Sequence, residues 1–557
     1  MFELPAAPRL TGAVLRSVVA ATSAEPVRRA LAAFMRKDLG IEAARALPAS
    51  QRGEIAPHIR PMKARDRHST VDGGLEAPTS PTAIGDARSW QAKYRDGSAT
   101  PVEVIERVFA EARRLEGATP TMACLCTPDV DNALRDAEAS AARWANGEPL
   151  GPLDGVAVPI KEEVNLEGIG YRLGTDFVDG EDDVHDGTVV HRLRAAGAII
   201  VGHTPMTEMG MSPLGVNVHR KMPRNAHAAD RAPGGSSTGS AIAVASGLAP
   251  LALGTDGGGS IRIPAALNGV FGIKPTFGRV SRHGDGFGGT VDHLGPIGAS
   301  THDLAIFLEA VSGPDPEDWL THDTESFAPG ALVSALGRGV EGLRIGVLRD
   351  EWADATDAVQ SACSEALSAL SADGATLVDV SLPLARHAAG IGYMTIGLET
   401  HAALLEARRH HWDRIGPSLQ LLMRMLSTFD ADDYLDAQAL RQRLRVSTAE
   451  LLREVDVLVL PTTAAAAVKV SDQDMLQGFA DTPALADVCR YAFLGNLTGL
   501  PCATAPVGSG AADLPVGLQV IGDAFDEATV LSVLAQLERN GVAEVRAPRI
   551  PVSPLGR

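Results

Sequence analysis

Residues 234–265 constrain the fold most strongly, because two clusters rich in glycine and serine are joined there by an apolar run (GGSSTGSAIAVASGLAPLALGTDGGGSIRIPA). The run has to be buried, so the fold must hold both polar clusters at the ends of a core segment. Gly257, Gly258 and Gly259 precede Ser260, and a glycine-rich turn can gather several backbone N–H groups around one point. Such donors stabilise developing negative charge, and Ser260 lies where a nucleophile is needed.

A candidate base for this serine lies elsewhere in the chain. A serine hydroxyl attacks only when a base removes its proton, and residues 234–265 contain no histidine. The segment GPLDGVAVPIKEEVNLEG places Lys161 directly after the apolar run 156–160. A lysine at the end of a buried strand is desolvated, which favours its neutral form and lets it act as a base. Taken alone, Lys161 is better explained as a surface lysine whose stem lies along the protein, and only the two serine clusters reverse this preference.

The stretch 234–265 resembles the signature of the amidase signature family of serine hydrolases, a Gly-Gly-Ser-Ser cluster followed by Gly-Thr-Asp-x-Gly-Gly-Ser-x-Arg-x-Pro. The resemblance implies that Ser260 is the nucleophile and Lys161 the base. It implies that Ser236, after a cis peptide bond to Gly235, relays the proton between them. The implied reaction is acyl transfer from an amide to water, without a metal or an organic cofactor.

The same resemblance gives roles to the neighbouring residues. It implies an oxyanion hole made by the N–H groups of Gly257, Gly258, Gly259 and Ser260. It also implies that Asp256, Arg262 and Ser237 support the site structurally. A catalytically dead scaffold is the alternative from another class of function, and the joint presence of Lys161, Ser236 and Ser260 argues against it.

The order of the expected elements predicts an α/β protein. Short apolar runs at 195–204, 343–350 and 455–463 are typical of buried strands, and helical stretches alternate with them. The resemblance covers about residue 85 to the C-terminus. It implies the amidase signature fold, a large mixed sheet covered by helices on both faces. We therefore expect an N-terminal helical extension and linker over 1–80 and a catalytic domain over 81–557.

Local signals predict several individual elements. Thr100 and Pro101 mark the start of a helix, as N-cap and first-turn residue. The Cys124-x-Cys126 pair has no further metal ligands near it in sequence, so we expect a strand there. The proline- and glycine-rich residues 51–85 predict a linker or an extended wrapping segment.

Residues 1–50 have apolar residues at helical spacing, with a break expected at Pro26. They are locally basic, through Arg9, Arg16, Arg28, Arg29, Arg36 and Lys37. This pattern predicts either a solvated helical face packed on the main body or a surface that meets anionic lipid or an amphiphilic substrate.

Composition limits the partners and the compartment. The formal net charge of −19 argues against nucleic acid, since phosphate binding needs a basic surface. The five cysteines lack the spacing of a disulfide framework, which indicates reduced thiols and a cytoplasmic protein. Membrane association is the alternative. Arg16 interrupts the run 13–21, so we expect no signal peptide, and no run approaches the ~20 apolar residues of a membrane span. The family resemblance also implies a homodimer.

Within the family, several segments resemble plant-type fatty acid amide hydrolases. They are 137–150, 254–279 and 288–300, with weaker likeness at APRLTG and FMRKDLGI near the N-terminus. This implies a small-molecule, lipid-like substrate, namely an N-acyl amide such as a fatty acid amide or an N-acylethanolamine. The apolar residues between Ile391 and Leu426 predict either an acyl tunnel or an ordinary helical core.

Four other functions remain as alternatives. A general short-chain or aryl amidase shares the whole signature. The amidase-type subunit of the glutamyl-tRNA amidotransferase also shares it, but it carries an aspartate near the position of Cys489, where this chain has only the nearby Asp487. An α/β-hydrolase esterase matches G-x-S-x-G at 235–239, without the preceding strand. A dinucleotide binder matches G-x-G-x-x-G at 284–289, which we expect to be a loop.

Overall fold

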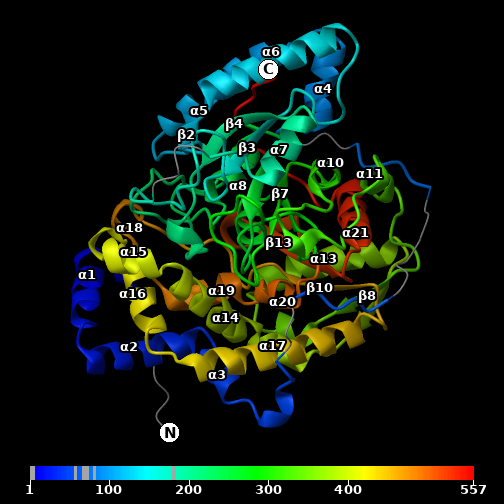
Figure 1. Ribbon diagram of the computed structural model, residues 1–557. Coiled ribbons are helices and arrows are strands. Elements are labelled where there is room, and N and C mark those ends of the chain that lie inside the picture. The colour runs from blue at the N-terminus through cyan, green and yellow to red at the C-terminus, as the bar shows by residue number, and fades with distance from the viewer. Residues whose placement is uncertain (1–6, 56–58, 66–73, 80–82, 179–183, 557) are drawn as a thin grey trace.

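The core of the computed structural model is one mixed sheet of eleven strands in the order β2-β4-β3-β5-β7-β6-β12-β13-β10-β8-β9 (Figure 1). The structure describes residues 7–55, 59–65, 74–79, 83–178 and 184–556. In sequence order the strands of this sheet are β2 Thr127–Pro128, β3 Ala157–Lys161, β4 Ile199–Thr204, β5 Leu251–Thr255, β6 Phe271–Lys274, β7 Leu294–Gly298, β8 Arg344–Val347, β9 Thr376–Asp379, β10 Val457–Pro461, β12 Cys502–Ser509 and β13 Pro515–Gly522.

Helices cover both faces of this sheet. Their bounds are α1 Gly12–Ala21, α2 Glu25–Asp38, α3 Ile41–Arg45, α4 Ala87–Arg95, α5 Pro101–Glu116, α6 Val130–Ala145, α7 Thr188–Ala195, α8 Thr238–Ala245, α9 Arg262–Leu267, α10 Thr301–Val311, α11 Ala331–Ala335, α12 Arg349–Trp352, α13 Asp357–Ala372, α14 Ala388–Ala403, α15 Leu405–His410, α16 Pro417–Leu426, α17 Ala431–Leu451, α18 Asp472–Gln477, α19 Thr482–Cys489, α20 Phe493–Thr498 and α21 Glu527–Arg539. Among the described residues, short 3-10 turns lie at Ala49–Gln51, Glu208–Gly210, Trp319–Thr321, Pro383–His387, Trp412–Arg414 and Ala511–Asp513.

Two groups of helices pack on the sheet. The helices α8 and α9 contact each other and the central strands, while α10, α13 and α21 form a second group that contacts the strands around β12 and β13. Strands buried in this way are apolar on both faces, and all five residues of β3 and of β5 are buried. This explains why the strands read as continuous apolar runs, and it confirms the predicted fold class.

The strand β3 pairs in parallel with both β4 and β5. The carboxyl ends of these strands therefore meet at one edge of the sheet, where a cleft for a ligand is expected. Lys161 is the last residue of β3 and Thr255 the last of β5. The sheet thus brings two polar side chains together at its edge.

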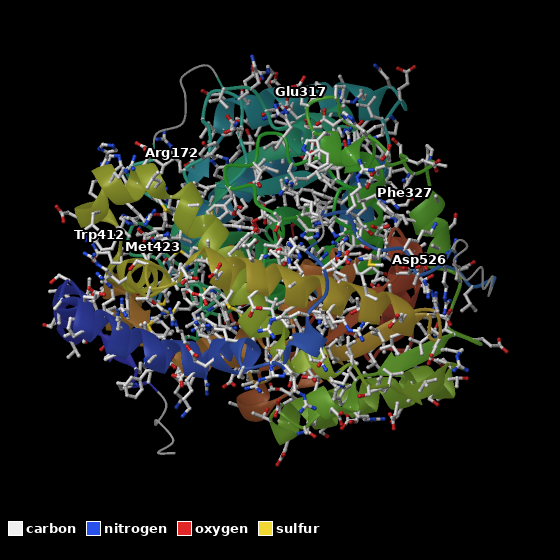
Figure 2. All side chains as sticks on the ribbon, turned by 60° about the horizontal axis from the view of Figure 1, so that its bottom comes forward. Arg172, Glu317, Phe327, Trp412, Met423 and Asp526 are labelled. Atoms are coloured by element: carbon white, nitrogen blue, oxygen red, sulfur yellow. The ribbon has the colours of Figure 1, made fainter. Side chains whose placement is uncertain are left out.

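The N-terminal helices lie against the body of the protein. In Figure 1 the blue α1 and α2 run beside α16, and Figure 2 shows Met423 of α16 next to them. The short strand β1 (Leu10–Thr11) pairs with β11 (Phe479–Ala480). Two basic residues of the N-terminal segment contact the rest of the protein. Arg9 forms an ion pair with Asp474, and Arg36 donates a hydrogen bond to the carbonyl of Thr428. The predicted domain boundary at 80/81 and the predicted lipid contact stay predictions.

Most elements lie where the sequence predicts them. The runs at 195–204, 343–350 and 455–463 form β4, β8 and β10. Pro26 does not break a helix; it lies in the first turn of α2, where its missing N–H costs nothing, and the break falls at 22–24. The predicted strand at Cys124–Cys126 is wrong, since pairing starts only at Thr127.

Parts of the predicted linker 51–85 lie outside the described residues, at 56–58, 66–73 and 80–82. Among the helices that the structure does describe, none combines the length and the hydropathy needed to cross a bilayer.

The start of α5 supplies a test of the local fold. Thr100 Oγ1 accepts from the N–H of Glu103, and the Glu103 carboxylate accepts from the N–H of Thr100. We expect Thr100→Ala to lower the free energy of unfolding by about 1 kcal/mol, since it leaves a helix N–H without its acceptor. Thr100→Ser keeps the acceptor and is the control; equal destabilisation by both variants in urea denaturation would contradict this role of the cap.

Candidate active site

The stretch 234–265 folds back on itself so that its two polar clusters meet. The apolar run forms the buried helix α8 and then the buried strand β5, so helix and strand together set the separation of the clusters. Small residues suit this place, because every residue of α8 is buried against the sheet. The Gly235–Ser236 peptide bond is cis, as the family resemblance implies. The N–H of Ser237 donates to the carbonyl of Ser260 at 3.2 Å, which joins the clusters directly.

Lys161 lies at the centre of the site with none of its side chain exposed. Its Nζ donates to Ser236 Oγ at 2.7 Å and to Thr255 Oγ1 at 2.6 Å. Glu163 Oε2 lies 2.7 Å from the same Nζ and accepts from Thr255 Oγ1 at 2.8 Å. Lys161 is therefore the buried lysine at a strand end that the sequence predicts, and the surface alternative is wrong.

Ser236 and Ser260 line one cavity together with Thr255 and Gly257. Ser236 is buried beside Lys161, whereas Ser260 is partly exposed to this cavity. Ser237 has a different place, since its hydroxyl donates to the carbonyl of Thr255 and accepts from the N–H of that residue. The geometry thus gives Ser260 access to a ligand, Ser236 contact with the lysine and Ser237 a bond to β5.

Asp256 and Arg262 form a fully buried ion pair at the base of the glycine loop. Nε and Nη2 of Arg262 each donate to the Asp256 carboxylate at 2.9 Å. The same carboxylate accepts from Asn496 Nδ2 and from the N–H groups of Gly259 and Ile261. Burial alone would raise the pKa of Asp256, but the Arg262 guanidinium outweighs it and holds this pKa below its ordinary value.

The glycine loop has two positions that require glycine. At Gly258 a Cβ atom would lie 2.5 Å from the ring of Phe493, and Gly259 has a φ of +115°. The N–H of Gly259 donates to Asp256 Oδ1 at 2.7 Å. Gly259 is one of the four predicted oxyanion donors, and its N–H is already used by Asp256. The N–H groups of Gly257, Gly258 and Ser260 are the other three predicted donors.

Two cavities of opposite character meet at Ser260. One has a volume of about 560 Å³ and is mainly apolar; it is lined by side chains that include Tyr393, Ile396, Leu422, Met425, Leu426, Leu485 and Phe493. The other has a volume of about 520 Å³, and its lining includes Glu163, Asp292 and Glu399.

The carboxylates of Glu163, Asp285 and Asp292 lie within 4.8 Å of one another. Burial is the main cause that raises the pKa of Asp285 and of Asp292, and the Glu163 carboxylate raises both further. The two aspartate carboxyl groups are hydrogen-bonded to each other, which raises the pKa of Asp292 and opposes the rise in that of Asp285. Glu163 Oε2 is already engaged with Lys161 Nζ and with the Thr255 hydroxyl. The acidic group therefore lies directly beside the predicted catalytic residues.

Several of these residues escape sequence reasoning. Thr255 lies inside the quoted signature and Glu163 two positions after Lys161, so proximity to the motif could have found both. Asp292 lies in the quoted segment 288–300 without any chemical signal of its own. Asp285 belongs to the 284–289 segment, which is a loop as predicted and contributes Phe287, Gly288 and Gly289 to the acidic cavity.

Comparisons with known proteins agree with this picture. A family model described as "Amidase" matches residues 106–531. The chain is 32% identical over 469 residues to a fatty acid amide hydrolase of Arabidopsis thaliana, covering 83% of this chain and 77% of that protein. It is 35% identical over 492 residues to a glutamyl-tRNA(Gln) amidotransferase subunit of Chloroflexus aurantiacus, covering 83% and 98%. The solved structure of a native peptide amidase from Stenotrophomonas maltophilia aligns with a TM-score of 0.71 at 26% identity, covering 84% and 99%.

The fold and these matches define an α/β enzyme that hydrolyses amides. The chain belongs to the amidase signature family, as the sequence of residues 234–265 predicts.

The buried ion pair makes a prediction for stability. Asp256→Asn leaves the Arg262 guanidinium buried without its counter-charge, so we expect a loss of about 3 kcal/mol in the free energy of unfolding. Because the pKa of Asp256 is lowered by folding, its stabilising contribution is full above the ordinary carboxyl pKa and is lost as the pH falls. Urea denaturation at several pH values measures both effects.

The control is Asp513→Asn, which removes a carboxylate paired with Arg546 at the surface. We expect this variant to unfold close to the wild type, because exposed pairs contribute little. A similar loss in the free energy of unfolding for the two variants would show that the buried ion pair contributes no more to stability than an exposed one.

Proposed function

We propose that the protein hydrolyses N-acyl amides with a long apolar acyl chain, through an acyl-enzyme on Ser260. The observation that carries this proposal is the apolar cavity at Ser260, next to the buried Lys161–Ser236 hydrogen bond. Fatty acid amides and N-acylethanolamines belong to this substrate class.

In the first half of the reaction Ser260 Oγ attacks the amide carbonyl carbon. Its proton passes to Ser236, and Ser236 gives its own proton to Lys161. Glu163 and Thr255 contact the Lys161 nitrogen and would stabilise the charge that it gains. The N–H groups of Gly257, Gly258 and Ser260 are the proposed donors to the developing oxyanion.

The leaving amine then takes a proton from Lys161 by way of Ser236, and the C–N bond breaks. Water attacks the Ser260 ester in the second half of the reaction and loses its proton along the same relay. The products are the free acid and the amine. Each proton transfer in this scheme uses only side chains of this chain, the substrate and water, and the buried position of Lys161 keeps bulk solvent from the relay.

A second cavity lies next to the one at Ser260, on the side of the N-terminal helices. Met211, Leu422 and Leu485 line both cavities, and the second, of about 780 Å³, reaches Met35 and Leu39 on and after α2. A long acyl chain could follow these side chains and bury its methylenes, at about 0.8 kcal/mol for each buried CH₂. Of the apolar residues between 391 and 426, Leu422 lines the cavity at Ser260, which supports the predicted acyl tunnel, while Met394 belongs to the core.

The relatives include both fatty acid amide hydrolases and subunits of the amidotransferase. The mainly apolar lining favours the first, because such a cavity offers few partners to a polar acyl group. Cys489 is buried in this lining, near the position where the amidotransferase pattern has an aspartate. A general short-chain or aryl amidase remains the second candidate, and a series of acyl chain lengths separates the two.

The relay predicts the effect of removing the base. We expect Lys161→Ala to lower kcat for any amide substrate by at least about 10³-fold, since no other base contacts Ser236 among the described residues. Ser260 labelling by a fluorophosphonate probe, followed by mass spectrometry, measures the same chemistry without a substrate. Near-normal turnover by the variant would overturn the proposed role of Lys161.

The cavity predicts chain-length selectivity. We expect kcat/KM for N-acylethanolamines to rise roughly 100-fold from short to long acyl chains, about 3 kcal/mol. Leu422→Trp fills the cavity and should remove most of this rise, whereas Leu435→Trp on the exposed side of α17 should retain it. If kcat/KM does not change with acyl chain length, or is highest for an aryl amide, the protein is a general amidase instead.

A further inference from the structure

One side chain, that of Met211, lines three cavities of this protein. It contributes to the apolar cavity at Ser260, to the acidic cavity at Ser260 and to the second apolar cavity near α2. No other described residue lines all three. Met211 therefore lies where the three cavities meet.

Three side chains separate the two apolar cavities. Leu422 of α16, Leu485 of α19 and Met211 line both of them. A ligand that extends from Ser260 into the second apolar cavity has to pass between these side chains. They form the wall between the two cavities.

The three side chains of this wall differ in how easily they move. Leu422 and Leu485 are branched and lie on helices, where the backbone allows few rotamers. The carbonyl of Leu485 also accepts a hydrogen bond from Tyr393 Oη at 3.2 Å. Met211 is unbranched, has three rotatable side-chain bonds and follows a short 3-10 turn. Its side chain is therefore the part of the wall that can swing aside.

The backbone that carries Met211 is held on several sides. The Glu208 carboxylate accepts from the N–H of Gly416 at 2.9 Å. The N–H of Met209 donates to the carbonyl of Leu173 at 2.7 Å, and the N–H of Met211 donates to the carbonyl of Glu208 at 3.1 Å. These bonds fix the turn, so a movement at this place is a rotation of the Met211 side chain and needs no movement of the loop.

The backbone conformation of the turn also directs Met211 toward the cavities. Met209 has a φ of +49° and Gly210 a φ of +68°, so two successive residues are left-handed. Met209 is fully buried, whereas Met211 is only partly buried and borders the cavities. A residue other than glycine keeps such a conformation only where its surroundings enforce it, and positions of this kind cluster at ligand sites.

We propose that Met211 is a side-chain gate between the two apolar cavities, and that it determines how long an acyl chain the enzyme accepts. The inference rests on the proposed function, in which the apolar cavity at Ser260 takes the acyl chain. A short chain ends before the wall. A long chain displaces the Met211 thioether and continues into the second cavity, whose lining includes Leu419, Leu421 and Phe479.

This gate favours unbranched alkyl chains. Rotation of one unbranched side chain vacates a passage of its own cross-section, which an unbranched alkyl chain can fill. The methylenes that enter the second cavity are removed from water, and this burial supplies the free energy for the rotation. The covalent steps of the proposed reaction stay the same.

Alkyl fluorophosphonates test the gate, because they react with Ser260 and release fluoride rather than an amine. The rate constant for labelling of Ser260 is measured on the full chain with a butyl and with a hexadecyl fluorophosphonate, by mass spectrometry of the protein. The ratio of the two rate constants, hexadecyl over butyl, reports passage through the wall. Because no amine leaves, the ratio does not depend on the leaving-group side of the site.

Two substitutions of Met211 should change this ratio in opposite directions. Met211→Phe places a larger and stiffer side chain in the wall, so we expect the ratio to fall at least about tenfold while the butyl rate constant stays within about threefold of the wild type. Met211→Ala removes the movable part of the wall, so we expect the ratio to rise at least about threefold.

Two further variants complete the experiment. Met62→Ala is the matched control, because Met62 is also partly buried but lines none of the three cavities, and its ratio should stay within about twofold of the wild type. Met211→Leu is the second blocking variant should Met211→Phe fail to fold. Its branched side chain has fewer rotamers, and we expect the ratio to fall about threefold.

Two results would contradict the gate. One is a ratio that stays within about twofold of the wild type in both Met211→Phe and Met211→Ala. The other is an equal loss of labelling by both probes in Met211→Phe, which would make Met211 only a neighbour of the nucleophile. A ratio that follows Met211, in a protein that does not hydrolyse long-chain N-acylethanolamines, would instead contradict the proposed function and leave the gate supported.

Discussion

The buried ion pair between Asp256 and Arg262 holds the glycine loop in place, and the rest of the site depends on it. Arg262 begins α9 and also donates to Asn496 of α20 and to Gln519 of β13. One guanidinium thus ties the loop to two elements that are distant in sequence. A pair buried to this degree is stable only with its hydrogen bonds satisfied, and the two residues make them with the loop backbone and these elements.

The second constraint is the meeting of β3 and β5 in the sheet. Parallel pairing places the ends of both strands at one edge, so Lys161 reaches Ser236 and Thr255 from a fixed position. Glu163 and Thr255 also contact the Lys161 nitrogen, and the sequence did not single them out.

The two cavities divide the neighbourhood of Ser260 by chemistry. Apolar side chains of α14, α16 and α20 line one of them, whereas the lining of the other includes the carboxyl groups of Glu163, Asp292 and Glu399.

The sequence by itself determined the fold class, the buried strands and the lysine–serine–serine set. Continuous apolar runs report burial directly, and the glycine–serine clusters of 234–265 are a contiguous pattern. Only the tertiary structure decided where Asp285 and Asp292 lie and that the Gly259 N–H donates to Asp256. It also decided that β2 starts at Thr127 and which side chains line the apolar cavity. These features depend on contacts between segments far apart in the chain, and their residues are ordinary in local sequence. Hydrophobic periodicity in the sequence indicates which face of an element is buried, but it does not indicate which residues that face contacts.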